Sequence, residues 1–277
     1  MLRHNLLIGI LLFAGWFPAV HAELVFRGEP IQGGLVIGQV PPGSRVEHDG
    51  KPVHVAADGH FLVGFERDAP KASQLVVRQH DGTVIRRELS VQSRDYDIQR
   101  IDGLPERKVT PKPEDLARIR ADGVAITRAR QRDDPRTDFL TGWQWPVTGR
   151  ISGVYGSQRI LNGKPKRPHF GVDIAAPEGT PVYAPADGVV TLLHPDMFYS
   201  GVTLLVDHGL GLSTVYLHLK RALVSEGERV RKGQPIAEVG ASGRATGPHL
   251  HWGMNLFKAR LDPALLVGPM PNPDKAG

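Results

Sequence analysis

Short hydrophobic runs that alternate with polar residues, separated by turn sequences, fill residues 24–91. The run at residues 74–91 is interrupted by Asp81-Gly82. An Asp-Gly pair between alternating runs is a strong β-hairpin signal, and several short strands at this spacing are typical of a sandwich. We therefore expect residues 23–92 to form a small N-terminal β-sandwich domain.

The pattern becomes polar after this region, and a helix is the next regular element that we expect. Residues 93–113 are rich in Arg, Asp and Pro. Residues 113–130 begin with proline and two acidic residues, which suit the first turn of a helix. We expect residues 93–138 to form a linker that contains this helix. Because a linker carries few contacts, the C-terminal region should fold without the sandwich.

A second β-rich pattern covers residues 139–268 and is followed by a short tail at 269–277. The 32 glycines and 23 prolines favour turn-rich β structure over long helices. The expected fold class is therefore mainly β, with an N-terminal sandwich, a helical linker and a C-terminal β domain.

The first 22 residues have the pattern of a secretory signal peptide. Arg3 precedes a hydrophobic run at residues 6–17, and small residues lead to Ala22. The run is short for a bilayer span, so an uncleaved membrane anchor is the weaker interpretation. We expect export, cleavage after Ala22 and no stable membrane insertion afterwards.

Charge and cysteine content narrow the possible partners. The net charge of +5 is spread along the chain, which does not favour a nucleic-acid partner and suits an anionic polymer such as a cell-wall glycan equally well. The chain has no cysteine, so any metal ion must be held by His, Asp, Glu or Asn.

The sequence HLH places His249 and His251 two residues apart. On a strand, such residues point to the same face, about 7 Å apart. Two exposed histidines on a sheet are the commoner explanation of so short a motif. The sequence HFGVD shifts the balance, because a bend at Gly171 would bring His169 and Asp173 together.

Imidazole and carboxylate groups together are a common zinc donor set. Two histidines and one carboxylate leave a fourth position for water, as in catalytic zinc sites. His218 lies in LSTVYLHLK, where alternation places it on the same face as Tyr216 and opposite Leu217. Taken alone, His218 is therefore an ordinary strand residue.

Three separated segments carry a family resemblance: HFGVDIAAPEGTPVYAPADGVV, STVYLHL and GERVRKGQPIAEVGASGRATGPHLHW. Together they resemble the lysostaphin/LytM-type zinc metallopeptidases, which cut peptides in bacterial cell walls. The resemblance covers about residues 145–262, with the motifs in the family's order. It implies that the C-terminal domain is an antiparallel sheet that lines a groove.

The resemblance also implies the roles of five residues. It assigns one zinc ion to His169, Asp173 and His251, and it makes His218 and His249 the catalytic pair. The implied reaction is hydrolysis of peptide cross-links in peptidoglycan by a zinc-activated water. The implied partners are peptidoglycan stem peptides, with D-alanine–diaminopimelate cross-links favoured, and the implied location is the periplasm.

Two alternative functions stay open at this stage. Some family members have lost ligands and only activate other wall hydrolases, and a related carboxypeptidase would trim terminal D-alanine. Arg159 and the basic residues 164–167 flank the metal motif. They are candidates for contact with an acidic stem peptide, although a solvated loop is the simpler interpretation.

Overall fold

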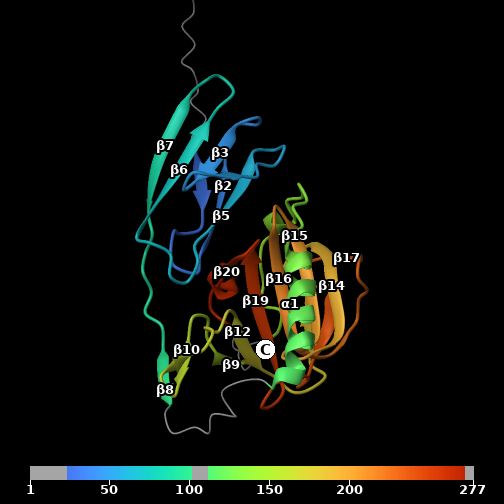
Figure 1. Ribbon diagram of the computed structural model, residues 1–277. Coiled ribbons are helices and arrows are strands. Elements are labelled where there is room, and N and C mark those ends of the chain that lie inside the picture. Colours follow the sequence, from blue (N-terminus) through green and yellow to red (C-terminus); the bar gives the residue numbers. More distant parts are fainter. Residues whose placement is uncertain (1–23, 102–111, 272–277) are drawn as a thin grey trace, which may run out of the picture.

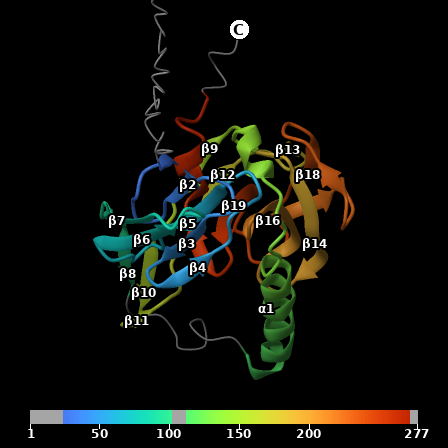
Figure 2. The same ribbon diagram turned by 90° about the horizontal axis from the view of Figure 1, so that it is seen from above.

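A computed structural model describes residues 24–101 and 112–271, and the expected signal peptide lies outside the described residues. Two β-rich parts lie side by side, with one long helix on the C-terminal part (Figures 1 and 2). Among the described residues, no helix has the length and hydrophobicity that a bilayer span requires.

The N-terminal part is the predicted small sandwich. One sheet has the order β1-β2-β5 and the other β4-β3-β6-β7, and all pairs are antiparallel. Their bounds are β1 Val25–Arg27, β2 Leu35–Gln39, β3 Arg45–His48, β4 Lys51–Val53, β5 His60–Gly64, β6 Ala72–Arg78 and β7 Val84–Ser90. Phe61 and Leu75 are fully buried between the sheets. The β6–β7 turn is at the predicted Asp81-Gly82 pair, where Gly82 has a φ of 88°.

The segment predicted as a linker contains more structure than we expected. Strand β8 (Ile98–Ile101) pairs in parallel with β10 (Gln158–Leu161), which forms a hairpin with β11 (Lys164–Pro165). The partner of β8 lies about sixty residues away, so local pattern could not reveal the pairing. The predicted helix is present as a 3-10 turn, Pro113–Asp115, followed by α1 (Leu116–Arg130).

The C-terminal part is built on one large antiparallel sheet with the central order β17-β14-β15-β16-β19-β12-β9. Strands β13 and β18 pair with each other, β18 also pairs with β16, and β20 pairs with β19. The bounds are β9 Arg150–Gly153, β12 Val172–Ala175, β13 Pro181–Tyr183, β14 Gly188–Met197, β15 Gly201–Gly209, β16 Leu212–Ala222, β17 Arg229–Val230, β18 Pro235–Val239, β19 His249–Leu256 and β20 Ala259–Leu261. Two 3-10 turns, Asp138–Thr141 and Pro263–Leu266, flank the sheet.

The two faces of this sheet pack against different parts of the protein. On β19, Leu250 and Trp252 point into the main hydrophobic core and are fully buried. The intervening histidines belong to the opposite face, since successive strand residues alternate. Helix α1 packs on that opposite face through Ala129, which contacts Leu205 and Val215 (Figure 1).

The two parts share a hydrophobic cluster, contrary to the expectation that few contacts cross the linker. Leu35 and Leu62 of the sandwich pack with Met254 and Leu261 of the C-terminal part. An ion pair of 2.9 Å joins the Arg94 guanidinium, in the predicted linker, to buried Asp262. Independent folding of residues 139–268 was expected from the linker alone, whereas this shared cluster favours joint unfolding of the two parts.

Candidate metal centre

Strand pairing places the acidic residue opposite one histidine of the HLH motif. In the β12–β19 register, Asp173 is directly opposite His251, and Ala175 is opposite His249. The side chains of directly opposed residues lie on the same face of a sheet. The motif therefore aims both imidazoles and the carboxylate at one place.

His169 reaches the same place from the segment before β12. The chain bends at Gly171, as the sequence predicted. A Cβ atom at Gly171 would lie 2.6 Å from the Trp252 carbonyl oxygen and 2.7 Å from His251 Nε2. Because a real Cβ atom does not approach other atoms so closely, the bend needs a residue without a side chain.

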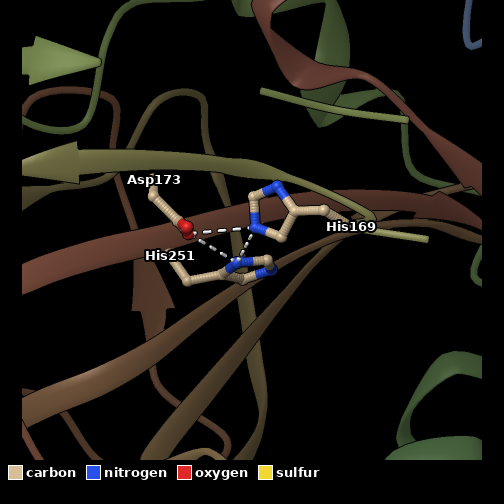
Figure 3. A group of neighbouring side chains, drawn as sticks. All are labelled: His169, Asp173 and His251. Atoms are coloured by element: carbon tan, nitrogen blue, oxygen red, sulfur yellow. Dashed lines mark hydrogen bonds and ion pairs between the residues drawn. The ribbon is translucent and has the colours of Figure 1, made fainter. Parts of the chain in front are cut away.

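Three donor atoms converge at the centre of the cluster (Figure 3). His169 Nε2 and His251 Nδ1 lie 3.0 and 2.9 Å from Asp173 Oδ1, and 2.9 Å from each other. Two imidazole nitrogens and a carboxylate oxygen are ligands that zinc prefers. The three residues are half-buried and could hold a metal ion.

A backbone contact fixes the orientation of the His169 ring. Its Nδ1 lies 3.0 Å from the Val154 carbonyl oxygen, which can only accept a hydrogen bond. Nδ1 therefore donates to this carbonyl, and Nε2 faces Asp173 and His251. Such outer contacts are the usual support of a histidine ligand.

The cluster keeps its carboxylate ionised. Burial opposes ionisation of Asp173, but hydrogen bonds with His169 and His251 lower the pKa of its carboxyl well below the usual range. Burial lowers the pKa of His251, which favours the neutral ring. At His169 burial also opposes the charged ring, but the hydrogen bond with Asp173 and the charge of Asp173 raise the pKa. A deprotonated carboxylate and a neutral imidazole are the forms that bind a metal.

His218 and His249 form a second pair beside the three donors. Their ring centroids are 4.8 Å apart. His218 Nδ1 lies 2.9 Å from the Ser242 carbonyl oxygen, and His249 Nδ1 lies 2.8 Å from the Gly247 carbonyl oxygen. Both rings therefore hold their proton on Nδ1 and leave Nε2 free to accept one. His249 Nε2 lies 4.0 Å from Asp173 Oδ1, so this pair adjoins the candidate metal centre.

The position of His218 depends on an irregularity in β16. Leu217 is opposite His251, and Tyr216 is opposite Trp252 on the core face. Alternation would place His218 on the core face with Tyr216, as we expected. Instead, its φ is 62°, in the left-handed region. The extra residue of this bulge turns the His218 ring to the histidine face.

Surrounding hydrogen bonds hold this backbone conformation. The His218 amide donates to the Ser200 carbonyl at 2.8 Å. The Ser242 hydroxyl donates to the Leu219 carbonyl at 2.7 Å and accepts from the Val202 amide at 2.9 Å. Burial lowers the pKa of His218 to about 4, so its ring is neutral at pH 7. Strained backbone held by several contacts is common at functional sites.

The remaining predicted site residue, Arg159, lies on the β10–β11 hairpin that precedes His169 in the chain. Arg159 is exposed on β10, and its carbonyl accepts a hydrogen bond from the Lys166 amide. The β10–β11 hairpin turns at Asn162-Gly163, where both φ angles are positive. A role for Arg159 in substrate binding stays a prediction.

Comparison with known proteins gives a consistent match. Residues 167–263 match the model of peptidase family M23. The crystal structure of a Pseudomonas aeruginosa protein assigned to peptidase M23 is 34% identical, with a TM-score of 0.65. That match covers 86% of this chain and 95% of the other.

Two curated relatives match over less than half of this chain. Peptidoglycan DD-endopeptidase ShyA of Vibrio cholerae is 46% identical over 134 residues, which are 47% of this chain and 28% of the relative. DD-carboxypeptidase/endopeptidase Mpg of Neisseria meningitidis is 41% identical over 125 residues, which are 45% of this chain and 29% of the relative. The chain thus spans less than a third of the length of these curated relatives.

Proposed function

This chain belongs to peptidase family M23, and from that premise we propose that it is an exported zinc metalloendopeptidase that hydrolyses peptide cross-links of bacterial peptidoglycan. One observation carries the proposal. Three metal-type donors and two histidines with free Nε2 atoms converge on one face of the C-terminal sheet. The name of ShyA, peptidoglycan DD-endopeptidase, supports the substrate class.

His169, Asp173 and His251 would hold the zinc ion. When bound, zinc polarises the scissile carbonyl and lowers the pKa of water towards roughly 7. The protein's own contribution at these positions is orientation. The Val154 carbonyl fixes the His169 ring, and the β12–β19 register fixes Asp173 against His251.

His218 and His249 would move the proton. Each ring is held by a backbone carbonyl at Nδ1, so Nε2 is the atom that accepts the proton of the attacking water. Once protonated, the same ring can stabilise the charge that develops on the substrate and return the proton to the leaving amine. Arg159 would contact an acidic stem peptide from the neighbouring hairpin.

The complete set of five residues argues against a catalytically silent activator, which would not need them. The carboxypeptidase alternative is favoured by one observation, since Mpg carries both activities in its name. The signal-like residues 1–22 support export, and a periplasmic location follows from the substrate.

The test is digestion of purified peptidoglycan by the chain that lacks residues 1–22, with products identified by mass spectrometry. An endopeptidase converts cross-linked dimers into monomers, whereas a carboxypeptidase releases free D-alanine from monomers. If the zinc-loaded protein releases neither product from peptidoglycan, the peptidase proposal is overturned.

A further inference from the structure

A large cavity lies between the sandwich and the C-terminal part. Its volume is about 1110 Å³, which is enough for several residues of a peptide. Sandwich residues 62–70 form one wall, and residues 256–260 form another. Phe170, next to the metal-type donor His169, and Arg130 at the end of α1 also line it.

Arg130 is a buried cation without a counter-charge. It is only 9% exposed, and its Nε atom has no hydrogen-bond partner. Among residues 24–101 and 112–271, it forms no ion pair. Arginine is almost never buried unless it is paired, because an unpaired buried charge is costly. A side chain kept in this state points to a ligand that supplies the missing charge.

Two further arginines surround the same place. The Arg260 guanidinium lies 5.8 Å from the Phe170 ring centre, and the Arg167 guanidinium lies 5.3 Å from it. Burial, together with repulsion from Arg260 and Arg167, lowers the pKa of Arg130 to about 8. An anion at this position would relieve the repulsion among the three cations.

The acidic residues on the cavity wall have other partners. Asp68 pairs with Arg67 at 2.6 Å, and Asp49 accepts a hydrogen bond from the Gln74 amide at 2.7 Å. The negative charge of Glu66 acts to raise the pKa of Arg260, but it is not among the causes that shift the pKa of Arg130. These acidic residues therefore do not neutralise the positive charge of Arg130, which is available to a ligand.

The cavity shares a sheet face with the candidate metal centre. Along β19, His251, Gly253 and Asn255 point to one face, and Arg260 is directly opposite Asn255 on β20. Arg260 Nη1 donates to Asn255 Oδ1 at 3.0 Å. Four strand residues span about 13 Å, so Asn255 and its partner Arg260 lie about four extended peptide residues from His251.

We propose that Arg130 and Arg260 form a subsite that binds a free carboxylate of the peptide substrate, three to four residues from the bond that is cut. This inference rests on the proposed function for the identity of the substrate. The planar guanidinium offers two parallel N–H groups, which match a carboxylate. A free inorganic anion has related chemistry, and the experiment below separates the two sources.

The test is calorimetric titration of the full zinc-loaded chain with three probes. They are a synthetic stem tetrapeptide with free carboxylates, the same peptide with those carboxylates amidated, and inorganic phosphate. The variants are Arg130→Met, which keeps the length of the buried side chain, and Arg128→Met, an exposed control on the same helix. Thermal unfolding shows whether each variant is folded. Arg130→Met should unfold at the same or a higher temperature, because it removes an unpaired buried charge.

We expect the carboxylate peptide to bind about tenfold more weakly to Arg130→Met than to the unchanged protein or to Arg128→Met. The amidated peptide should bind all three proteins equally weakly. Equal binding of both peptides to the unchanged protein, or equal effects of the two substitutions, would overturn the proposal. Arg130-dependent binding of phosphate without binding of the peptide would also overturn it.

Binding does not require hydrolysis, so this result stands apart from the proposed function. If the protein binds the carboxylate peptide through Arg130 but cuts no peptidoglycan, the peptidase proposal fails and the carboxylate site remains. If it cuts peptidoglycan and Arg130→Met binds the peptide normally, only the subsite is wrong.

Discussion

His218 lies beside His249, with ring centroids 4.8 Å apart, although regular strand alternation would place the two rings on opposite faces of the sheet. The left-handed backbone at His218, with a φ of 62°, is what brings them together. The candidate catalytic pair thus depends on a local backbone feature. The same feature is held by Ser200 and Ser242, which lie outside the motifs of the site.

We predict that Gly201→Ala impairs hydrolysis while zinc stays bound. A Cβ atom at Gly201 would overlap Ser242 Oγ, and Ser242 supports His218. A displacement of about 1 Å at a catalytic group can cost about 10²-fold in rate. Turnover of cross-linked peptide and zinc content are measured together.

The matched control is Gly50→Ala, which also has a positive φ but meets no atom within 4 Å. It should cost about 1 kcal/mol of stability and leave turnover unchanged. Equal turnover of the Gly201 and Gly50 variants would show that Ser242 does not position His218.

We predict that Gly171→Ala weakens zinc binding by roughly 10–100-fold, as do changes in the support of other metal ligands. The added Cβ would lie 2.7 Å from His251 Nε2 and would force that ring to move. Competition with a chelator measures the affinity. Gly123→Ala on α1 meets no atom within 4 Å and should leave zinc affinity unchanged. Unaltered affinity in the Gly171 variant would mean that the bend tolerates a side chain.

We predict that the two parts unfold together. Leu62, in the sandwich, is buried in the cluster that it shares with the C-terminal part. In the chain without residues 1–22, all tryptophans lie in the C-terminal part. Leu62→Ala should lower the free energy of unfolding reported by tryptophan fluorescence by about 2–5 kcal/mol. Val124→Ala, exposed on α1, should change it little. A tryptophan transition that does not respond to Leu62→Ala would restore the picture of independent domains.

We predict that the exported protein begins at Glu23, because small residues up to Ala22 follow the hydrophobic run. N-terminal sequencing of the exported fraction checks this. Recovery of a chain that still begins at Met1 would show that the segment is retained.

The sequence was sufficient for the parts of the fold that local chemistry controls. The Asp81-Gly82 turn, the helix after Pro113 and the bend at Gly171 each follow from a residue that restricts or frees its own backbone. The approach of His169 to Asp173 could be anticipated from the bend at Gly171, whereas the choice of His251 over His249 as the third donor came from the family resemblance.

Other features depend on partners that are remote in the sequence. The pairing of β8 with β10 and the packing of Leu62 against Met254 join segments far apart in the chain. The backbone at His218 departs from the strand alternation that was used to predict its face. Arg130 is one basic residue among many in the sequence, and only its burial without a counter-charge distinguishes it.

The most direct test of the account compares zinc content and peptidoglycan hydrolysis in His251→Ala and His249→Ala. His251→Ala removes one of three metal-type donors and should lose most of its zinc together with activity. His249→Ala removes a proton-handling group and should keep its zinc while hydrolysis falls by about 10²–10⁴-fold. Elemental analysis gives zinc per chain, and mass spectrometry of digested peptidoglycan gives the rate. If His249→Ala empties the site while His251→Ala stays loaded, the roles are reversed, and if both variants keep zinc and activity, the metallopeptidase account is contradicted.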